Sequence, residues 1–524
     1  MKDATNNDSS LRLAELVAAF TLAVDLGLGQ PMEHVLRSWL IAARLGSHVG
    51  VKREERGALY YVATLAWVGC VADTPELSAW FGDDIAYRHD GYELDQTGRP
   101  LVDFMLRHAG AGRPPLERAR VAADLMAAGP SAIEAIIRSH CLVTSTMADR
   151  LGLGAEVRDP LNQFFTRWDG NGVPDLAGDA IALPMRLYQL ADVVEVAQRA
   201  GGKDAAIAVA RERRGTQFDP AIVDAFTAVA DDVLGDPVID TDWQMLISDE
   251  PSLQRRLSES ELDAALEAVA DFTDLRSPPR AGHSRGVADL VSKAAAEMGL
   301  PAVEVLALRR AGLLHDIGLH GVPATILEKP GPLSHSEWER MRVHAYYTER
   351  VLSRPPVLAR LGAIASLTNE RCDGSGYHRG LARPAISVAG RLLGAVCAYR
   401  AMIEPRAYRP AFTPKQAAME LRREVHAGRL DADAVDAVLA AAGHDQGKRR
   451  SGPAGLTPRE VEVLVLIARG GSTRQAAQAL GISAKTAGTH IERIYSKIGA
   501  STRSTATLFA MQHGLLDTLD PLDS

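Results

Sequence analysis

Four residues in the second half of the chain have side chains that bind metal ions in proteins. His283 is followed by the adjacent pair His315 and Asp316, and then by His344. They lie in Ala- and Leu-rich stretches with helical periodicity, so we expect them on helices that pack together. Imidazole nitrogens and a carboxylate suit Fe, Mn or Zn. The set predicts a site for one divalent ion, and the alternative is a group of buried histidines that only satisfy their neighbours.

The same spacing occurs earlier in the chain and indicates an internal repeat. The anchors, sixteen residues apart, are His283, Gly299 and His315 in the second half and His34, Gly50 and Ala66 in the first. Further matches pair His344 with His140, Asp373-Gly-Ser-Gly with Asp169-Gly-Asn-Gly, and Ile386 and Arg391 with Ile181 and Arg186. The constant order predicts two copies of one helical domain, over residues 1–235 and 255–445.

Together with the motif Asp373-Gly-Ser-Gly-Tyr377, the ordered histidines and the His-Asp pair resemble the HD-GYP family of cyclic di-GMP phosphodiesterases. That family is a branch of the HD superfamily of metal-dependent phosphohydrolases, and the resemblance covers about Leu275 to Ala442. It implies a helical fold, a nucleotide ligand, and a ligand pocket that includes Asp373, Gly376 and Tyr377.

The catalytic residues of the family are only partly present. In the family, two or three metals are held by the residues described above, by a paired His-His and by a distal Asp. Thr368 and Asn369 stand at the paired positions, and Cys397 stands at the distal one. Metals in fixed geometry are needed to generate the attacking hydroxide and to stabilise the developing charge. The replacements at these three positions remove ligands from both metals of a two-metal site. We therefore assign no catalytic residue and no required cofactor, and expect at most one weakly held metal, with Cys397 as a further candidate ligand.

The first copy departs further from the family. It keeps His34, His140 and Asp192, whereas Ala66-Trp67 replaces the His-Asp pair and Phe164-Phe165 replaces the His-His pair. The aromatic replacements are large and apolar, so they would fill a ligand cavity. We expect a structural or ligand-sensing role for this copy, with His34 and His140 as ordinary polar residues.

The last 70 residues carry the capping signals of four short helices. The expected N-caps are Thr457, Ser472, Ser483 and Ser501. Glu460 and Gln475 complete capping boxes with the first two. The connection from Gly481 to Ser483 is three residues long, which predicts a helix-turn-helix.

The third of these helices combines a buried stripe with a polar face. The stripe consists of Ala487, Ile491, Ile494 and Ile498, at i, i+4, i+7 and i+11. The module from about Gly455 to Leu516 closely resembles the LuxR-type helix-turn-helix of bacterial transcription regulators. In that family the third helix enters the major groove, and the fourth commonly supports dimerisation.

This second resemblance implies that a homodimer binds double-stranded operator DNA. The residues expected at base edges are Lys485, Thr489 and Arg493, and those expected at phosphates are Thr486, Lys497 and Arg503. Gly488 and Glu492 stand where the family often has basic residues, which weakens the attraction to phosphate.

The charge of the chain is divided unevenly. From Lys448 to Leu516, ten basic residues stand against three acidic ones, a net charge of +7. Because the whole chain carries −8 and the tail after Leu516 has three aspartates, residues 1–447 carry −12. A basic module on an acidic body indicates nucleic-acid contact at one end. The alternative is a solvated basic face.

Composition excludes several other classes. A chain of 524 residues is too long for one ordinary core, and 46% hydrophobic with 24% charged residues excludes disorder and a polytopic membrane protein. The four cysteines stand singly, which argues against a disulfide framework. The polar start and the lack of a long apolar stretch predict a cytoplasmic protein without membrane contact. We expect a mainly α fold with two HD-like domains, a linker over residues 446–455, the helix-turn-helix over 456–516 and an acidic tail over 517–524.

Two functions fit this organisation. A transcription regulator would sense a ligand or partner with its impaired HD-GYP-like body and bind operator DNA with its C-terminal module. The alternative is a metal-dependent phosphodiesterase acting on a cyclic dinucleotide such as cyclic di-GMP. Since ligand positions are lost in both copies, we favour the regulator. An assembly protein whose repeats only dimerise would leave the basic module without a purpose.

Overall fold

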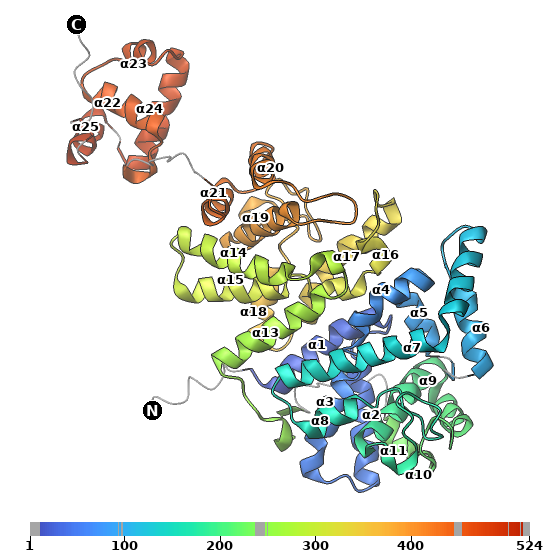
Figure 1. Cartoon of the computed structure of the whole chain (residues 1–524). Coiled ribbons are helices and arrows are strands. Elements are labelled where there is room, and N and C mark those ends of the chain that lie inside the picture. Colours follow the sequence, from blue (N-terminus) through green and yellow to red (C-terminus); the bar gives the residue numbers. More distant parts are fainter. Residues whose placement is uncertain are drawn as a thin grey trace, which may run out of the picture. The chain divides into compact units, whose positions relative to one another are not determined.

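The computed structural model describes residues 11–92, 94–95, 98–235, 247–248, 250–444, 453–500, 502–513 and 515–516. The chain divides into two compact units, Met1–Ala442 and Gly443–Ser524. Within the described ranges the regular structure consists of α-helices and short 3-10 turns, with isolated β-bridges only (Figure 1). The prediction of a mainly α fold is confirmed.

The larger unit contains both predicted copies. Its first half consists of α1 (Leu13–Gly27), α2 (His34–His48), α3 (Arg56–Leu65), α4 (Cys70–Phe81), α5 (Asp84–Gly91), α6 (Gly98–His108), α7 (Pro115–Arg150), α8 (Ala155–Leu161), α9 (Leu183–Glu212), α10 (Pro220–Ala228) and α11 (Ala230–Leu234). Its second half consists of α13 (Glu259–Asp274), η4 (Pro278–Arg280), α14 (His283–Glu297), α15 (Ala302–Leu314), η5 (Ile317–Gly321), α16 (Ala324–Leu327), α17 (His335–Val351), α18 (Pro356–Ala365), α19 (Val388–Ile403), α20 (Pro414–His426) and α21 (Ala432–Ala441).

Both halves start with the same local structure. Asp25 before α2 and Asp274 before α14 each accept a hydrogen bond from the backbone N–H of the helix's second residue, at 3.1 and 2.9 Å. The N-cap residues of the two helices share a left-handed φ of 77°. These matching caps place His34 and His283 at the first position of their helices.

The ends of the two halves also match. Asp219 caps α10 and pairs with Arg186 at 2.7 Å, while Asp431 caps α21 and pairs with Arg391 at 3.1 Å. The two halves therefore have matching hydrogen bonds at both ends, and the repeat itself stays a prediction. The boundaries at residues 1–235 and 255–445 stay predictions.

The two halves of the larger unit share one core instead of folding as separate bodies. A single hydrophobic cluster includes buried residues of α1 and α3 from the first half and of α13, α14, α15 and α19 from the second. Helix α1 is buried on nearly all sides and contacts η5 and α17. Because η5 directly follows His315 and Asp316, the first copy supports the segment that carries the predicted metal ligands.

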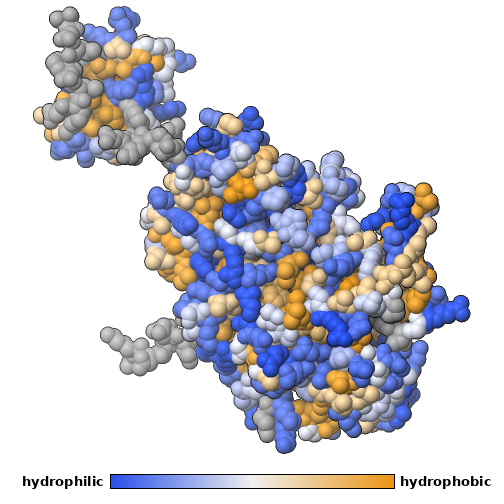
Figure 2. Space-filling view, viewed as in Figure 1, coloured by the Kyte–Doolittle hydropathy of each residue, from blue (hydrophilic) through white to orange (hydrophobic). Residues whose placement is uncertain are grey.

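The surface and the cysteines agree with the composition. The face of the larger unit in Figure 2 is mostly hydrophilic, with apolar side chains in scattered patches. None of the described helices combines the length and apolar character that crossing a bilayer requires. All four cysteines are free thiols.

The smaller unit consists of α22 (Pro458–Ala468), α23 (Thr473–Ala479), α24 (Ala484–Ile498) and α25 (Arg503–Gln512) around its own apolar cluster. Thr457, Ser472 and Ser483 are N-caps, as predicted. Helix α25 is capped by Thr502 because its hydroxyl and that of Thr505 each accept from the other residue's backbone N–H. The expected cap Ser501, most of the linker and the tail over 517–524 lie outside the described residues.

Candidate metal and DNA-binding sites

Three of the four predicted metal ligands lie together in the second half. His283 begins α14, His315 follows the end of α15, and Asp316 is the N-cap of η5. The Oδ2 atom of Asp316 lies 3.5 Å from Nε2 of His283 and 3.1 Å from Nε2 of His315. All three residues are buried, and their ligand atoms lie within 4.8 Å of one another. We call this group the HD trio.

The hydrogen bonds of the two rings fix their tautomers. Nδ1 of His283 donates to the Glu404 carboxylate at 2.6 Å, and Nδ1 of His315 donates to the carbonyl of Gly312 at 2.8 Å. Burial holds the pKa of both imidazoles well below the usual range, so both are neutral. Their Nε2 lone pairs therefore face the Asp316 carboxylate, an arrangement that requires a cation.

The donors of the HD trio fit one divalent transition metal. Two neutral imidazoles, each held by an outer hydrogen bond, and one carboxylate form a ligand set of the kind seen at such sites. When bound, such a metal polarises a phosphoryl oxygen and lowers the pKa of its water. His283, His315 and Asp316 are the residues that would hold it.

The fourth predicted ligand, His344, belongs to a separate hydrogen-bond chain. Its Nδ1 donates to the carbonyl of Met341 at 2.6 Å, and the amide nitrogen of Asn369 lies 3.1 Å from its Nε2. Tyr377 donates to the other end of the Asn369 amide at 2.9 Å. Burial lowers the pKa of His344 to about 4, so its ring is neutral and its lone pair accepts from Asn369. A role for His344 as a metal ligand stays a prediction.

The predicted pocket residues have different positions. The exposed Asp373 closes a turn by accepting from the backbone and hydroxyl of Ser375, at 3.0 and 2.6 Å. A Cβ at Gly376 would collide with backbone atoms of Asn369, so the turn needs glycine there. Of the three, Tyr377 reaches the site, and its ring lies 5.5 Å from the guanidinium carbon of Arg342 and 6.0 Å from the ring of Trp338.

In the first half the equivalent histidines are charged. His34 lies between two carboxylates, with Nδ1 at 2.5 Å from Glu195 and Nε2 at 3.2 Å from Asp192. Although burial by itself lowers the pKa of His34, hydrogen bonds to these carboxylates raise it to about 10. The indole of Trp67 also donates to Asp192, at 3.2 Å. Both of these partners of Asp192, His34 and Trp67, therefore lie in the first half of the chain.

His140 is also an unsuitable metal ligand. Its Nδ1 lies 3.0 Å from Asp73 and its Nε2 lies 2.8 Å from the carbonyl of Ala66. Burial opposes protonation, but the bonds to Asp73 and Cys70 raise the pKa of His140 well above the usual range. Cys70, Asp73 and His140 are close enough to share an ion. Both ring nitrogens donate, however, so no lone pair is available.

In the smaller unit, the polar face of α24 is open. Lys485, Thr486, Thr489 and Arg493 are exposed, whereas Ala487 and Ile494 of the predicted stripe are fully buried. Neither Lys485 nor Arg493 has an ion pair among the described residues. Lys497, in contrast, pairs with Glu460 at 2.7 Å.

Arg503 also has partners within the smaller unit. It donates to the carbonyl of Ile467 at 2.8 Å and to that of Gly471, at the end of α22. Lys497 and Arg503, two of the three residues predicted to contact phosphates, therefore also stabilise the smaller unit itself.

Comparison with known proteins matches two segments of the chain to family models. Residues 267–434 match the model of the HD domain, and residues 454–510 match the model described as bacterial regulatory proteins, luxR family. The chain therefore contains an HD domain and a luxR-family module. The first match lies within the predicted second copy, and the second overlaps the predicted helix-turn-helix over 456–516 and begins two residues before it.

Relatives of this HD-domain protein include cyclic dinucleotide phosphodiesterases. It is 28% identical over 423 residues to 3'3'-cGAMP-specific phosphodiesterase 3 of Vibrio cholerae, covering 79% of this chain and 91% of that protein. It is 39% identical over 147 residues to a cyclic di-GMP phosphodiesterase of Thermotoga maritima, covering 28% of this chain and 40% of that protein. The crystal structure of the V. cholerae cyclic GMP-AMP-specific phosphodiesterase V-cGAP3 has a TM-score of 0.58 at 25% identity, covering 83% of this chain and 98% of that chain. The similarity therefore extends into the first half.

Sequence reasoning missed several residues around the HD trio. The guanidinium of Arg280 contacts Asp316, and Arg400 and Arg406 pair with Glu404 at 2.6 and 3.0 Å. The sequence positions of two of them could have indicated their proximity to the site. Arg280 is three residues before the candidate ligand His283, and Glu404 is two helical turns after the candidate ligand Cys397. Burial raises the pKa of the Cys397 thiol to about 12, so it is protonated at neutral pH.

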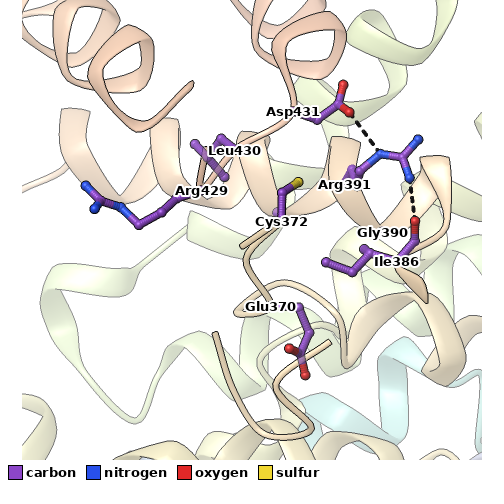
Figure 3. A pocket seen from close by; sticks show the side chains of 9 residues that line it. Glu370, Cys372, Ile386, Gly390, Arg391, Arg429, Leu430 and Asp431 are labelled. Carbon is purple, nitrogen blue, oxygen red and sulfur yellow. Dashed lines mark hydrogen bonds and ion pairs between the residues drawn. The ribbon is translucent and has the colours of Figure 1, made fainter. Parts of the chain in front are cut away.

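A small cavity between the start of α19 and the segment before α21 is too small for a ligand. It is lined by Glu370, Cys372, Ile386, Gly390, Arg391, Gly394, Arg429, Leu430 and Asp431, and has a volume of about 10 Å³ (Figure 3). That volume holds one water at most. Glu370 is already satisfied by the backbone N–H groups of Arg379 and Leu381, at 2.8 and 2.7 Å.

Proposed function

We propose that the chain is a DNA-binding transcription regulator whose HD-domain body binds a ligand and hydrolyses it slowly or not at all. The observation that carries this proposal is the luxR-family module, in which Lys485, Thr489 and Arg493 face outward from α24 while the opposite face is buried. A capped, basic helix with exposed polar side chains fits the major groove. A homodimer would place two such helices on two half-sites.

A cyclic dinucleotide is the ligand class that fits the body. Relatives named as cyclic GMP-AMP and cyclic di-GMP phosphodiesterases support it. On this chain, the charge of Arg280 suits a phosphodiester, and the rings of Tyr377 and Trp338 suit a base. Arg342 over the Tyr377 ring adds a second cation next to that ring.

We expect impaired hydrolysis because metal-ligand positions of the family are replaced in this chain. A pair of metals stabilises both the attacking and the leaving oxygen of a phosphodiester. Asn369 donates to His344 where the family has a second histidine, and Cys397 is a protonated thiol where the family has a carboxylate. One metal at the HD trio would leave the second position without ligands.

The alternative function, a metal-dependent phosphodiesterase, is favoured by the HD trio itself. The test is hydrolysis of cyclic di-GMP and 3'3'-cGAMP by the full chain with added Mn²⁺ or Fe²⁺. We expect no turnover, or turnover as slow with Asp316→Ala as with the unchanged protein. Rapid hydrolysis that Asp316→Ala abolishes would establish the enzyme instead.

DNA binding is tested by fluorescence anisotropy with the full chain and promoter fragments at two salt concentrations. Arg493→Ala should weaken binding by roughly tenfold because it removes a base or phosphate contact. Arg423→Ala removes an exposed arginine from α20 of the body and is the matched control. If the unchanged chain shows no salt-sensitive binding, with or without cyclic dinucleotides, the regulator proposal fails.

A further inference from the structure

The HD trio is in contact with an arginine. Arg280 ends the turn η4, in which its backbone N–H donates to the carbonyl of Ser277 at 2.8 Å. Its guanidinium contacts the Oδ2 atom of Asp316, the same atom that faces both imidazoles. Its side chain is only 16% exposed, so the contact is inside the protein.

This contact solves the electrostatic problem of the HD trio. Two imidazole lone pairs and a carboxylate point at one another, and they repel unless a cation lies among them. A metal ion is one such cation. The guanidinium of Arg280 is another, and it is covalently attached to the chain three residues before His283.

The charges around the HD trio disfavour having both cations. Arg280, Arg400 and Arg406 stand near three carboxylates, those of Asp316, Glu404 and Asp274. The positive charges already balance the negative ones, and a divalent ion beside Asp316 would add two more in a buried site. A metal therefore has to displace the Arg280 guanidinium from the carboxylate.

We propose that Arg280 is a built-in counter-cation of the HD site, which competes with a divalent metal for Asp316. The site alternates between an arginine-paired state and a metal-bound state, and the arginine-paired state predominates at low metal concentration. This proposal concerns metal occupancy alone and does not depend on DNA binding. It gives the regulator a physical reason for weak metal binding beyond the loss of family ligands.

The test compares metal binding by the full chain and two variants. Each protein is stripped with EDTA and titrated with Co²⁺, followed by calorimetry and by the visible absorption of the bound ion. Arg280→Gln removes the competing charge, and we expect it to bind one Co²⁺ per chain with at least roughly tenfold higher affinity than the unchanged protein. His315→Ala in the same background should abolish the gain.

Arg400→Gln is the matched control because it removes a nearby charge that contacts Glu404 and not Asp316. It should change the affinity much less than Arg280→Gln. An equal gain in both variants would show a general effect of charge and overturn the proposal, as would equal affinity in Arg280→Gln and the unchanged protein.

A measurement on the unchanged chain covers the case in which Arg280→Gln does not fold. Binding to the native state raises the melting temperature in proportion to the logarithm of ligand concentration over Kd. We expect the melting temperature of the unchanged chain to be the same in micromolar Mn²⁺ or Co²⁺ as in EDTA. A clear rise at micromolar metal would overturn the proposal.

Discussion

At the scale of the residue, the two copies use matching histidines in opposite protonation states. His34 is protonated between Asp192 and Glu195, whereas His283 is neutral and directs a lone pair at Asp316. The difference lies in the partners. Both rings lie between two carboxylates, but the carboxylates at His283 are already paired with arginines. Burial and these guanidinium charges disfavour an imidazolium at His283. The first copy thus carries its cation in the ring itself, whereas in the second copy the cation beside Asp316 is Arg280 or a metal ion.

This contrast predicts the effect of His34→Gln. The change removes the imidazolium from between the buried Asp192 and Glu195. Glu195 keeps its ion pairs with Arg37 and Arg199, so the loss falls mainly on Asp192, and the free energy of unfolding should fall by about 3 kcal/mol at pH 6 to 7. The exposed His48, on the same helix, provides the control variant His48→Gln. Denaturant unfolding measures both, and equal stabilities of the two variants would contradict the buried ion pair.

The same variant has a predicted pH dependence. The pKa of His34 is about 10 in the folded chain, above the value near 6.5 of an unfolded histidine. The stabilisation is therefore complete below about pH 6.5 and is lost as the pH rises toward 10, at up to about 1.4 kcal/mol for each pH unit. The stability difference between the unchanged chain and His34→Gln should shrink over that interval. A constant difference from pH 6 to pH 9 would show that His34 is neutral.

Spacing predicted the residues of the HD trio but could not predict their electrostatics. The intervals between His283, His315 and Asp316 follow from helix packing, which periodicity reports. The contact of Arg280 with Asp316 and that of Glu404 with His283 depend on how η4 and the end of α19 approach the trio. Such approaches are set by tertiary packing, and no local pattern encodes them.

At the scale of the element, α24 contains a glycine that its structure does not require. A Cβ at Gly488 would meet no atom within 4 Å, and the residue is in the middle of the helix. Replacing it with alanine should stabilise the module by about 1 kcal/mol because glycine is a poor helix former. Thermal unfolding of the module measures this gain.

Gly470 provides the contrasting control for that change. A Cβ there also meets no atom within 4 Å, but its φ of 100° disfavours any side chain. Gly470→Ala should therefore destabilise the module while Gly488→Ala stabilises it. If Gly488→Ala also weakens DNA binding, the glycine is kept for close approach to DNA. A lower melting temperature for Gly488→Ala would contradict the helix argument.

The caps show what the sequence can say about elements. Thr457 and Ser472 were predicted because a hydroxyl residue three positions before a glutamate or a glutamine completes a capping box, and Ser483 because serine is a preferred N-cap. At the fourth helix two neighbouring hydroxyl residues compete. The choice of Thr502 depends on its reciprocal bonds with Thr505, which the expectation of Ser501 overlooked.

Arg503 connects elements as well as carrying charge, which predicts a separable phenotype. Its guanidinium donates to the carbonyl of Ile467 in the last turn of α22 and to that of Gly471 just after the helix, so Arg503→Ala should lower the stability of the module by about 1 to 2 kcal/mol. Arg503→Lys keeps the charge and loses the two-pronged bond. If Arg503 also contacts phosphate, Arg503→Lys should keep most of the DNA affinity at low temperature while its melting temperature falls. Loss of neither property would contradict both roles.

At the scale of the whole molecule, a buried ion network joins the two copies. Asp84 of α5 accepts from Arg88 at 2.7 Å in its own half, and from Arg276 at 3.2 Å and the backbone N–H of Ala324 at 2.9 Å in the other. Asp84 and Arg276 are almost completely buried. The shared core and this network explain why a repeat that is clear in sequence gives one compact unit.

The network predicts cooperative unfolding of the body. Asp84→Asn leaves Arg276 buried without its counter-charge and should destabilise the larger unit by roughly 3 kcal/mol. Calorimetry of the full chain should show one transition for both copies, shifted by this variant, and a second for the luxR-family module, which is unshifted. The half-exposed Asp90 supplies the control Asp90→Asn. Separate transitions for the two copies would contradict the shared core.

The division into two compact units also predicts how DNA recognition is distributed. The fragment 453–524 contains the caps, the apolar cluster and the outward-facing Lys485, Thr489 and Arg493, so it should fold alone and keep the sequence preference of the full chain. Its affinity should be lower, because one module reads one half-site and we assign part of the dimer interface to the acidic body. Binding of both proteins to DNA selected by the full chain from a random pool, and to scrambled DNA, measures preference and affinity separately. The contradicting result is a folded fragment that binds both DNAs equally well, with a Kd of about 10⁻⁴ to 10⁻⁶ M, which is typical of non-specific binding. That result would place the base contacts outside the module.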